Sequence, residues 1–169
     1  MTIWFTSDHH FHHRNIIKLC NRPYDTVESM NDALIAKWNM VVAPKDEVWY
    51  LGDFGFFNSL GGIDEAKLIF EMLHGQKHLI VGNHDHKRVR ALDWKSVQKY
   101  HRLKVNGVYI ILCHYPIENW ELRREENSIH LHGHSHGRSA KIPYKIDVGV
   151  DANHFIPLSL KAILCQFDM

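Results

Sequence analysis

Five short polar motifs follow one another along this chain, and all of them are built largely from residue types that bind metal ions. They are Ser7-Asp8-His9-His10, Gly52-Asp53, Gly82-Asn83-His84-Asp85, His114 and His132-Gly133-His134-Ser135-His136. Aspartate, asparagine and histidine offer oxygen and nitrogen donors that suit divalent first-row metals, and none of the motifs contains cysteine. The motifs therefore predict a centre with two metal ions, and cleavage of a phosphate ester is the chemistry that such a centre best explains.

Each motif directly follows an apolar stretch that has the composition of a β-strand. Runs of β-branched and aromatic residues predict strands at 3–6, 47–51, 78–81, 100–105 and 108–113. Because side chains at the ends of strands meet at one edge of a sheet, the motifs are expected to converge. Asn106-Gly107 predicts a hairpin between the last two strands, so the sheet is expected to be mixed.

Two amphipathic helices are expected between these strands. Apolar residues three or four positions apart predict a helix over 27–38, with Asp25 and Glu28 as its capping box. The same spacing predicts a helix from about 63 to 73, which Gly75 ends. Strand and helix signals together indicate the α/β class.

The bulk composition indicates a soluble globular protein. The chain has 169 residues, of which 45% are hydrophobic and 23% charged, and this predicts a single domain over 1–169. A net charge of +1 provides no overall attraction to nucleic acid or to an anionic membrane. The first residues lack the pattern of a signal peptide, and the longest apolar run, Val108 to Cys113, is too short to span a bilayer. Three scattered cysteines fit reduced thiols, so we expect a cytoplasmic protein without a membrane partner.

The ordered set D-x-H, G-D, G-N-H-D, H and G-H-x-H resembles the calcineurin-like metallophosphoesterase superfamily. The resemblance spans Asp8 to His136, and the sequences Asn-Arg-Pro at 21–23 and Asp-Val-Gly-Val-Asp at 147–151 look most like compact phage and bacterial members. A single short motif of this kind is a weak signal, whereas all five in order are a strong one. The resemblance implies a four-layer α-β-β-α sandwich with mixed β-sheets.

The resemblance also implies how the two ions are held. One ion is bound by Asp8, His10 and His136, the other by Asn83, His114 and His134, and Asp53 bridges them. A shared carboxylate leaves room for a hydroxide between the ions, and this hydroxide would attack the phosphate in line. The donor set favours Mn²⁺ or Fe and admits Zn²⁺, Ni²⁺ or Co²⁺, whereas Mg²⁺ alone fits less well.

His84 and Asp85 are the expected catalytic side chains. By the family pattern His84 faces the substrate, and as general acid it would protonate the leaving group while Asp85 fixes its tautomer. The alternative is that both residues only cap a helix over 85–90.

Further residues are expected to contact the substrate or to support the ligands. Asn83 is expected to bind substrate as well as metal, and Arg14 and Arg22 are either a fork for phosphate or solvated surface residues. Asp147 and Asp151 are expected to hold ligand imidazoles by hydrogen bonds, or else to make ordinary turns. His9 and His132 are expected to face away from the ions, because neighbouring side chains on a strand point to opposite faces.

The sequence therefore predicts a dinuclear, metal-dependent hydrolase of phosphomonoesters or phosphodiesters. A nuclease or cyclic-nucleotide phosphodiesterase with the same centre is the alternative enzyme, and a catalytically silent interaction scaffold is the alternative from another class. The expected partner is a small phosphorylated molecule or nucleotide; nucleic acid is a possible partner that the charge does not indicate. The arginine that follows the bridging aspartate in protein phosphatases has no counterpart after Asp53, which disfavours phosphoprotein substrates. Monoester or diester preference and oligomeric state stay open.

Overall fold

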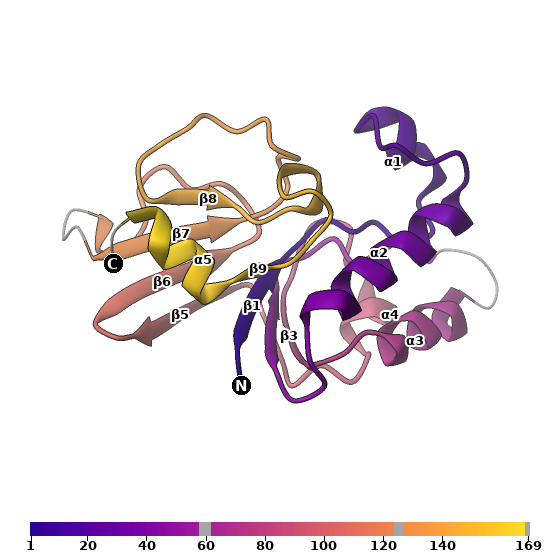
Figure 1. Ribbon diagram of the computed structural model, residues 1–169, viewed down its shortest axis with the longest axis horizontal. Helices are drawn as coiled ribbons and strands as arrows, with labels where there is room; N and C mark the ends of the chain where they lie inside the picture. The colour runs from indigo at the N-terminus through magenta and orange to yellow at the C-terminus, as the bar shows by residue number, and fades with distance from the viewer. Residues whose placement is uncertain (58–61, 124–126, 168–169) are drawn as a thin grey trace.

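Two β-sheets packed against each other form the centre of the computed structural model, which describes residues 1–57, 62–123 and 127–167. The first sheet has the order β4-β3-β2-β1-β9, and its strands are Ser96–Gln98, Gln76–Ile80, Glu47–Tyr50, Ile3–Thr6 and Leu158–Ser159. The second has the order β5-β6-β7-β8, and its strands are Tyr100–Val105, Val108–Cys113, Ser128–His132 and Lys145–Asp147. Figure 1 shows the two sheets side by side.

Both sheets are mixed, as predicted. Strands β1 to β4 run parallel and β9 is antiparallel to β1, whereas β5 and β6 form the antiparallel hairpin predicted at Asn106-Gly107 and β6, β7 and β8 run parallel. The α/β class with two mixed sheets and flanking helices is therefore confirmed. The parallel strands bring the ends of β1, β2 and β3 to one edge of the first sheet, and those of β6 and β7 to one edge of the second.

Helices cover the outer face of the first sheet. Helices α2 (Val27–Val41) and α3 (Gly62–Met72) lie on this face (Figure 1). The short helix α5 (Leu160–Leu164) directly follows β9 and contacts β9 and β1, and its Ile163 is buried in the core between the sheets. Side chains alternate along β2, so that Val48 and Tyr50 face the helices while Trp49 and Leu51 face the second sheet. Each face of the first sheet thus belongs to its own hydrophobic core.

The predicted capping box of α2 is wrong by one residue. Thr26, not Asp25, has the extended backbone of an N-cap, and its side chain accepts a hydrogen bond from the Ser29 amide at 3.1 Å. Ser29 in turn completes the capping box that was assigned to Glu28. Gly75 follows α3 with a φ of +90°, a backbone conformation that suits glycine at the end of a helix.

The elements missed by the sequence analysis are short. Among the described residues they are α1 (Arg14–Leu19), β4, β7, β8, β9, α5 and the 3₁₀ turns η2 (Val150–Ala152) and η3 (Cys165–Phe167). The helix expected over 85–90 is reduced to α4 (Lys87–Arg90), whose N-cap is His86 without a side-chain hydrogen bond. His84 and Asp85 therefore do not cap this helix.

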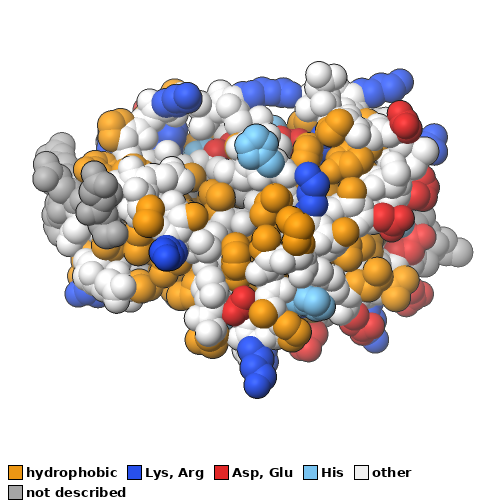
Figure 2. Space-filling view, in the orientation of Figure 1, with side chains coloured by type: hydrophobic (Ala, Val, Ile, Leu, Met, Phe, Trp, Pro, Cys, Tyr) orange, Lys and Arg blue, Asp and Glu red, His pale blue; other side chains and the backbone are white. Residues whose placement is uncertain are grey.

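The surface carries charges of both signs. On the face shown in Figure 2, acidic side chains gather at the end where α2 and α3 lie, and basic ones are scattered along the edges. In the part of the chain that the structure describes, no helix is long and apolar enough to cross a membrane.

The packing of α2 predicts a large difference between two of its residues. Leu34 is fully buried, whereas Met40 on the same helix is 68% exposed. We expect Leu34→Ala to lower the free energy of unfolding by about 2–5 kcal/mol, because it leaves a cavity beneath the helix. Met40→Ala is the control and should change it by less than about 0.5 kcal/mol. Urea denaturation measures both, and equal effects would contradict this packing.

Candidate metal centre

The five motifs lie where β1, β2, β3, β6 and β7 end, and backbone hydrogen bonds join them. The Asp8 amide donates to the Gly52 carbonyl at 3.0 Å, and the His10 amide to the Asp53 carbonyl at 3.1 Å. In the second sheet the Gly133 amide donates to the His114 carbonyl at 2.9 Å. The structure thus brings the motifs together, as the order of the strands predicts.

The backbone at this junction is unusually tight. Five of the proposed ligands have a positive φ: Asp8, His10, Asp53, His134 and His136. Such conformations cost about 1–3 kcal/mol each for residues other than glycine and cluster at functional sites. The glycines of the motifs allow close approach, since a Cβ on Gly82 would lie 2.3 Å from an Asp53 carboxylate oxygen and one on Gly133 2.4 Å from an Asp8 carboxylate oxygen. The glycines are therefore part of the site.

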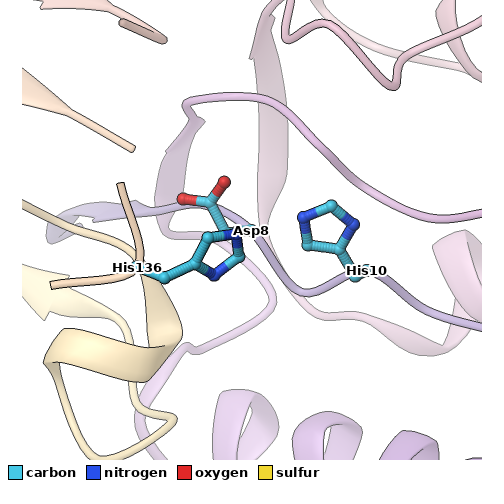
Figure 3. A group of neighbouring side chains, drawn as sticks. All are labelled: Asp8, His10 and His136. Atoms are coloured by element: carbon cyan, nitrogen blue, oxygen red, sulfur yellow. The ribbon is translucent and has the colours of Figure 1, made fainter. Parts of the chain in front are cut away.

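Asp8, His10 and His136 form the first group of proposed ligands, which we call half-site 1. Their donor atoms lie within 4.8 Å of one another, and Figure 3 shows the three side chains gathered around the end of β1. Asp8 is fully buried and His10 is 3% exposed. Among the described residues, the buried Nε2 atom of His10 has no hydrogen-bond partner, which fits an atom that binds an ion.

His114, His134 and Asn83 form the second group, half-site 2. The donor atoms of His114 and His134 lie within 4.8 Å of each other and of the Asp53 carboxylate. The side-chain oxygen of Asn83 is 3.0 Å from the Nε2 atom of His114. His114 is fully buried, whereas Asn83 and His134 are exposed.

Asp53 lies between the two half-sites. Its Oδ2 atom is 3.6 Å from Nε2 of His10 and 3.5 Å from Nε2 of His114. Its Oδ1 atom accepts a hydrogen bond from the His84 amide at 2.8 Å. Oxygen and nitrogen donors on both sides of one carboxylate fit a pair of divalent cations, with Asp53 shared between them.

Burial and charge set the protonation of these groups in the metal-free protein. Burial alone would raise the pKa of Asp53, but the hydrogen bond and charge of His114 outweigh it and lower this pKa to about 2. Burial lowers the pKa of His10 to about 2, so its imidazole is neutral and able to bind an ion. Burial raises the pKa of Asp8 to about 7.

Asp151 contacts the imidazole of His136, one of the proposed ligands, which is the contact expected of it. Its Oδ2 atom is 2.6 Å from Nδ1 of His136. Burial opposes the charged form of His136, but the hydrogen bond to Asp151 raises the pKa of His136 to about 10. Asp147 does not touch a ligand imidazole; it accepts hydrogen bonds from the Ser135 hydroxyl and the amides of Gly137 and Gly149. Its role corresponds to the alternative, an ordinary turn contact.

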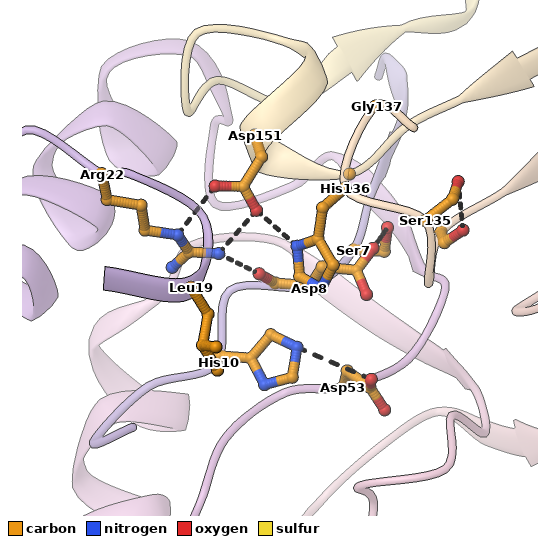
Figure 4. Close-up of polar contacts among 12 residues, drawn as sticks. Ser7, Asp8, His10, Leu19, Arg22, Asp53, Ser135, His136, Gly137 and Asp151 are labelled. Atoms are coloured by element: carbon orange, nitrogen blue, oxygen red, sulfur yellow. Dashed lines mark hydrogen bonds and ion pairs between the residues drawn. The ribbon is translucent and has the colours of Figure 1, made fainter. Parts of the chain in front are cut away.

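Neither expected role of Arg22 agrees with the structure. The side chain is fully buried, and its guanidinium contacts Asp151 and the Asp8 carbonyl (Figure 4). It also contacts the His9 carbonyl and the Met30 sulfur. With its donors engaged inside the protein, it is neither a fork for phosphate nor a solvated residue. Arg14 is exposed, and its proposed contact with phosphate stays a prediction.

Asp85 has a different role from the one expected. Its carboxylate is fully buried and accepts hydrogen bonds from the backbone amides of Asp53, Phe54 and Gly82, at 3.0, 2.9 and 2.7 Å. These bonds occupy both oxygens, so Asp85 anchors the loop that carries Asp53 and does not orient the His84 ring. A spacing of about 30 residues between partners gives no local sequence signal for this contact.

The three motif histidines that are not proposed ligands fall into two groups. His9 faces the helices, where its Nδ1 atom is 3.0 Å from the Tyr50 hydroxyl, and His132 Nδ1 is 2.9 Å from the Gly133 carbonyl. Both therefore lie away from the ligands. The His84 ring, in contrast, lies 5.3 Å from that of His10 and 6.5 Å from that of His13.

Two exposed aromatic rings adjoin the site, and the sequence analysis did not single out Tyr115. Phe56 is 40% exposed and stacks on His13 at 5.2 Å, and Tyr115 is 47% exposed and lies 4.9 Å from the His134 ring. Tyr115 directly follows the proposed ligand His114 in the sequence, and this position is the signal that could have identified Tyr115 as a neighbour of the site.

The protonation of half-site 1 predicts how metal affinity depends on pH. Because the raised pKa values of Asp8, about 7, and His136, about 10, leave protons on these groups, a bound cation must displace them. We expect about one to two protons released per chain at pH 7, and an affinity for Mn²⁺ that rises with pH, most steeply below pH 7. Calorimetry in buffers of different ionisation enthalpy measures this. The exposed Asp32→Asn variant should give the same proton count, and an affinity that falls as pH rises would contradict the assignment.

The three hydrogen bonds to Asp85 predict a structural effect of its replacement. Asp85→Asn loses one acceptor oxygen and turns an NH₂ group toward backbone donors, so we expect the free energy of unfolding to fall by about 1–3 kcal/mol or more. The same change at the exposed Asp32 is the control. Denaturant unfolding of the metal-free protein compares them, and an unchanged midpoint for Asp85→Asn would contradict the anchoring role.

Comparison of the sequence with known proteins assigns the chain to a family. Protein MJ1445 of Methanocaldococcus jannaschii is 36% identical over 96% of this chain and 89% of its own length. The Gene 66 protein of Mycobacterium phage L5 is 31% identical over 88% of this chain and 86% of its own length. No family model matches the sequence.

Among solved structures, AQ665 from Aquifex aeolicus, a protein of unknown function, has 26% identity and a TM-score of 0.76 over 98% of both chains. An archaeal phosphodiesterase and the E. coli phosphoesterase Yfce also align, with identities of 20% and 16% and TM-scores of 0.43 and 0.46, values too low to support a shared activity. The curated relatives decide the matter: the chain belongs to the family of MJ1445 and the phage Gene 66 protein.

Proposed function

We propose that this protein is a metal-dependent phosphoesterase that uses two divalent ions. The observation that carries the proposal is the position of Asp53, whose Oδ2 atom lies 3.6 and 3.5 Å from the Nε2 atoms of His10 and His114. Histidines from two different sheets thus face one shared carboxylate. The resemblance of all five motifs to calcineurin-like metallophosphoesterases supports the same function.

The charges of the site favour a phosphate substrate. The seven proposed ligands include only two carboxylates, those of Asp8 and Asp53, so two divalent ions leave the site positive. Two ions bound here would lower the pKa of a shared water and offset the charge that develops on the phosphoryl group. We expect Mn²⁺ or Fe in this role; Zn²⁺, Ni²⁺ and Co²⁺ also suit the donor set.

His84 is the proposed general acid. Its amide is anchored on Asp53 at 2.8 Å, and its half-buried ring lies beside that of His10. A histidine there is well placed to donate a proton to an alkoxide leaving group. Since Asp85 is engaged with backbone amides, His84 acts without the carboxylate partner that the sequence analysis gave it.

A nucleotide phosphodiesterase is the second candidate, and two exposed rings favour it. Tyr115 adjoins the proposed ligand His134, and Phe56 stacks on His13, whose ring is next to that of His10. Both rings are partly exposed and offer flat faces on which a base could stack. With a net charge of +1, a long nucleic acid is the less favoured substrate. A scaffold without catalysis is disfavoured because all seven ligand positions are filled.

Hydrolysis assays with the Mn²⁺-loaded protein test the function. We would compare p-nitrophenyl phosphate, bis-p-nitrophenyl phosphate, 2′,3′-cyclic nucleotides and single-stranded RNA. Asp53→Asn should reduce hydrolysis to background, because it removes the charge between the two half-sites, whereas the exposed Asp32→Asn should retain full activity. Equal activity of the Asp53→Asn variant and the unaltered protein would contradict the proposal.

The general-acid role of His84 predicts a dependence on the leaving group. His84→Ala should slow hydrolysis of an alkyl ester, whose leaving group needs a proton, by about 100-fold or more, and that of a p-nitrophenyl ester by less than about tenfold. Metal content should be unchanged, and its measurement is the control. Equal losses on both substrates would contradict the role.

A further inference from the structure

A buried arginine connects the segments that carry half-site 1. The side chain of Arg22 is fully buried, and its Nε and Nη2 atoms each donate to one oxygen of Asp151 at 2.8 Å. Nη1 and Nη2 also donate to the carbonyls of His9 and Asp8, each at 2.7 Å. One guanidinium therefore fixes both the loop after β1 and the turn η2, which are remote in sequence (Figure 4).

Asp151 connects Arg22 to the imidazole of His136. The carboxylate of Asp151 uses Oδ1 for Arg22 alone, while its Oδ2 atom receives both Arg22 and Nδ1 of His136. With Nδ1 occupied, Nε2 is the nitrogen left to bind an ion. Arg22 thus acts on two ligands at once, on His136 through Asp151 and on Asp8 through its carbonyl.

Half-site 2 has no comparable support in the described residues. Nδ1 of His114 faces the Leu51 carbonyl at 2.7 Å, an uncharged partner. His134 is exposed and its ring borders Tyr115, and apart from Asp53 no carboxylate of the described residues contacts either imidazole. The two half-sites therefore differ in how firmly their ligands are held.

We propose that Arg22 is a positioning residue for half-site 1, and that its contacts make the two half-sites unequal: half-site 1 holds its ion tightly and half-site 2 exchanges its ion. The inference rests on the proposed function only in assuming that two ions bind. Preorganised ligands give up less conformational freedom on binding, which is why the better supported group binds more tightly.

The geometry requires arginine rather than any cation. A guanidinium presents a rigid fork that fits a carboxylate and still has donors for two carbonyls, whereas a lysine ammonium has three donors and no fork. Cys20 also lies within 4.8 Å of donor atoms of His136 and Asp151. Because Arg22 already neutralises Asp151, these three residues do not form a separate cation site.

Titration of the metal-free protein with MnCl₂ tests the proposal without any substrate. Calorimetry and elemental analysis after dialysis should find two classes of site, and His134→Ala should abolish the weaker one. Arg22→Gln should weaken the tighter class by about 10- to 100-fold and leave the weaker class unchanged. Arg22→Lys should not restore the affinity of the tighter class. The control is Arg138→Gln. The Arg138 side chain donates to the Leu19 carbonyl, in the segment that leads to Arg22, and this bond does not involve a proposed ligand. Its loss should change the affinity of neither class of site.

A second variant keeps the test valid if Arg22→Gln fails to fold. Asp151→Asn should weaken the same class, and the effects of Asp151→Asn and Arg22→Lys should not add, because both act through one contact. Equal weakening of both classes, no change in either, or rescue by lysine would overturn the proposal. Two bound Mn²⁺ without hydrolysis of any ester would instead refute the proposed function and leave this inference standing.

Discussion

The fold has to keep one carboxylate charged while almost removing it from water. Asp53 is 1% exposed, and an unpaired buried charge would be too costly for a protein of this size. The His84 amide, at 2.8 Å, and the imidazole of His114, whose Nε2 atom is 3.5 Å away, provide the compensation. These partners come from both sheets, so the ionised state of Asp53 depends on the packing of one sheet against the other.

Parallel strands provide that convergence, and the turns after them complete it. An extended strand would keep Asp8 and His10, which are two positions apart, on the same face of the sheet. The left-handed backbone at Asp8, His10 and Asp53 redirects the chain within each motif. The strain is tolerated because the surroundings fix it, as where Asp85 binds the amides of Asp53 and Phe54. The strained backbone of the motifs is therefore held in place by hydrogen bonds from residues that are distant in the sequence.

These relations explain what could be predicted from the sequence. The strands and the proposed metal-binding motifs are local patterns, and the motifs lie where such strands must end. The contacts that hold the ligands are not local: Arg22 and Asp151 are 129 positions apart, and Asp85 and Asp53 are 32 apart. An arginine or aspartate in a polar segment looks the same whether it binds a phosphate, meets water or is buried against a partner. The roles of Arg22 and Asp85 were therefore wrong, and elements of two to six residues, such as β9 and α1, were too short to show a period.

The buried pair of Arg22 and Asp151 is hard to explain by stability alone. Removing both charges from water costs much of what their attraction returns, so apolar side chains of similar size could stabilise this position equally well. Apolar side chains, however, would provide neither an acceptor for Nδ1 of His136 nor donors for the carbonyls of Asp8 and His9. What the pair provides is direction: it sets which nitrogen of His136 faces the centre and where the loop of Asp8 lies. A contact of this kind is best explained by the ion that its neighbours are arranged to hold.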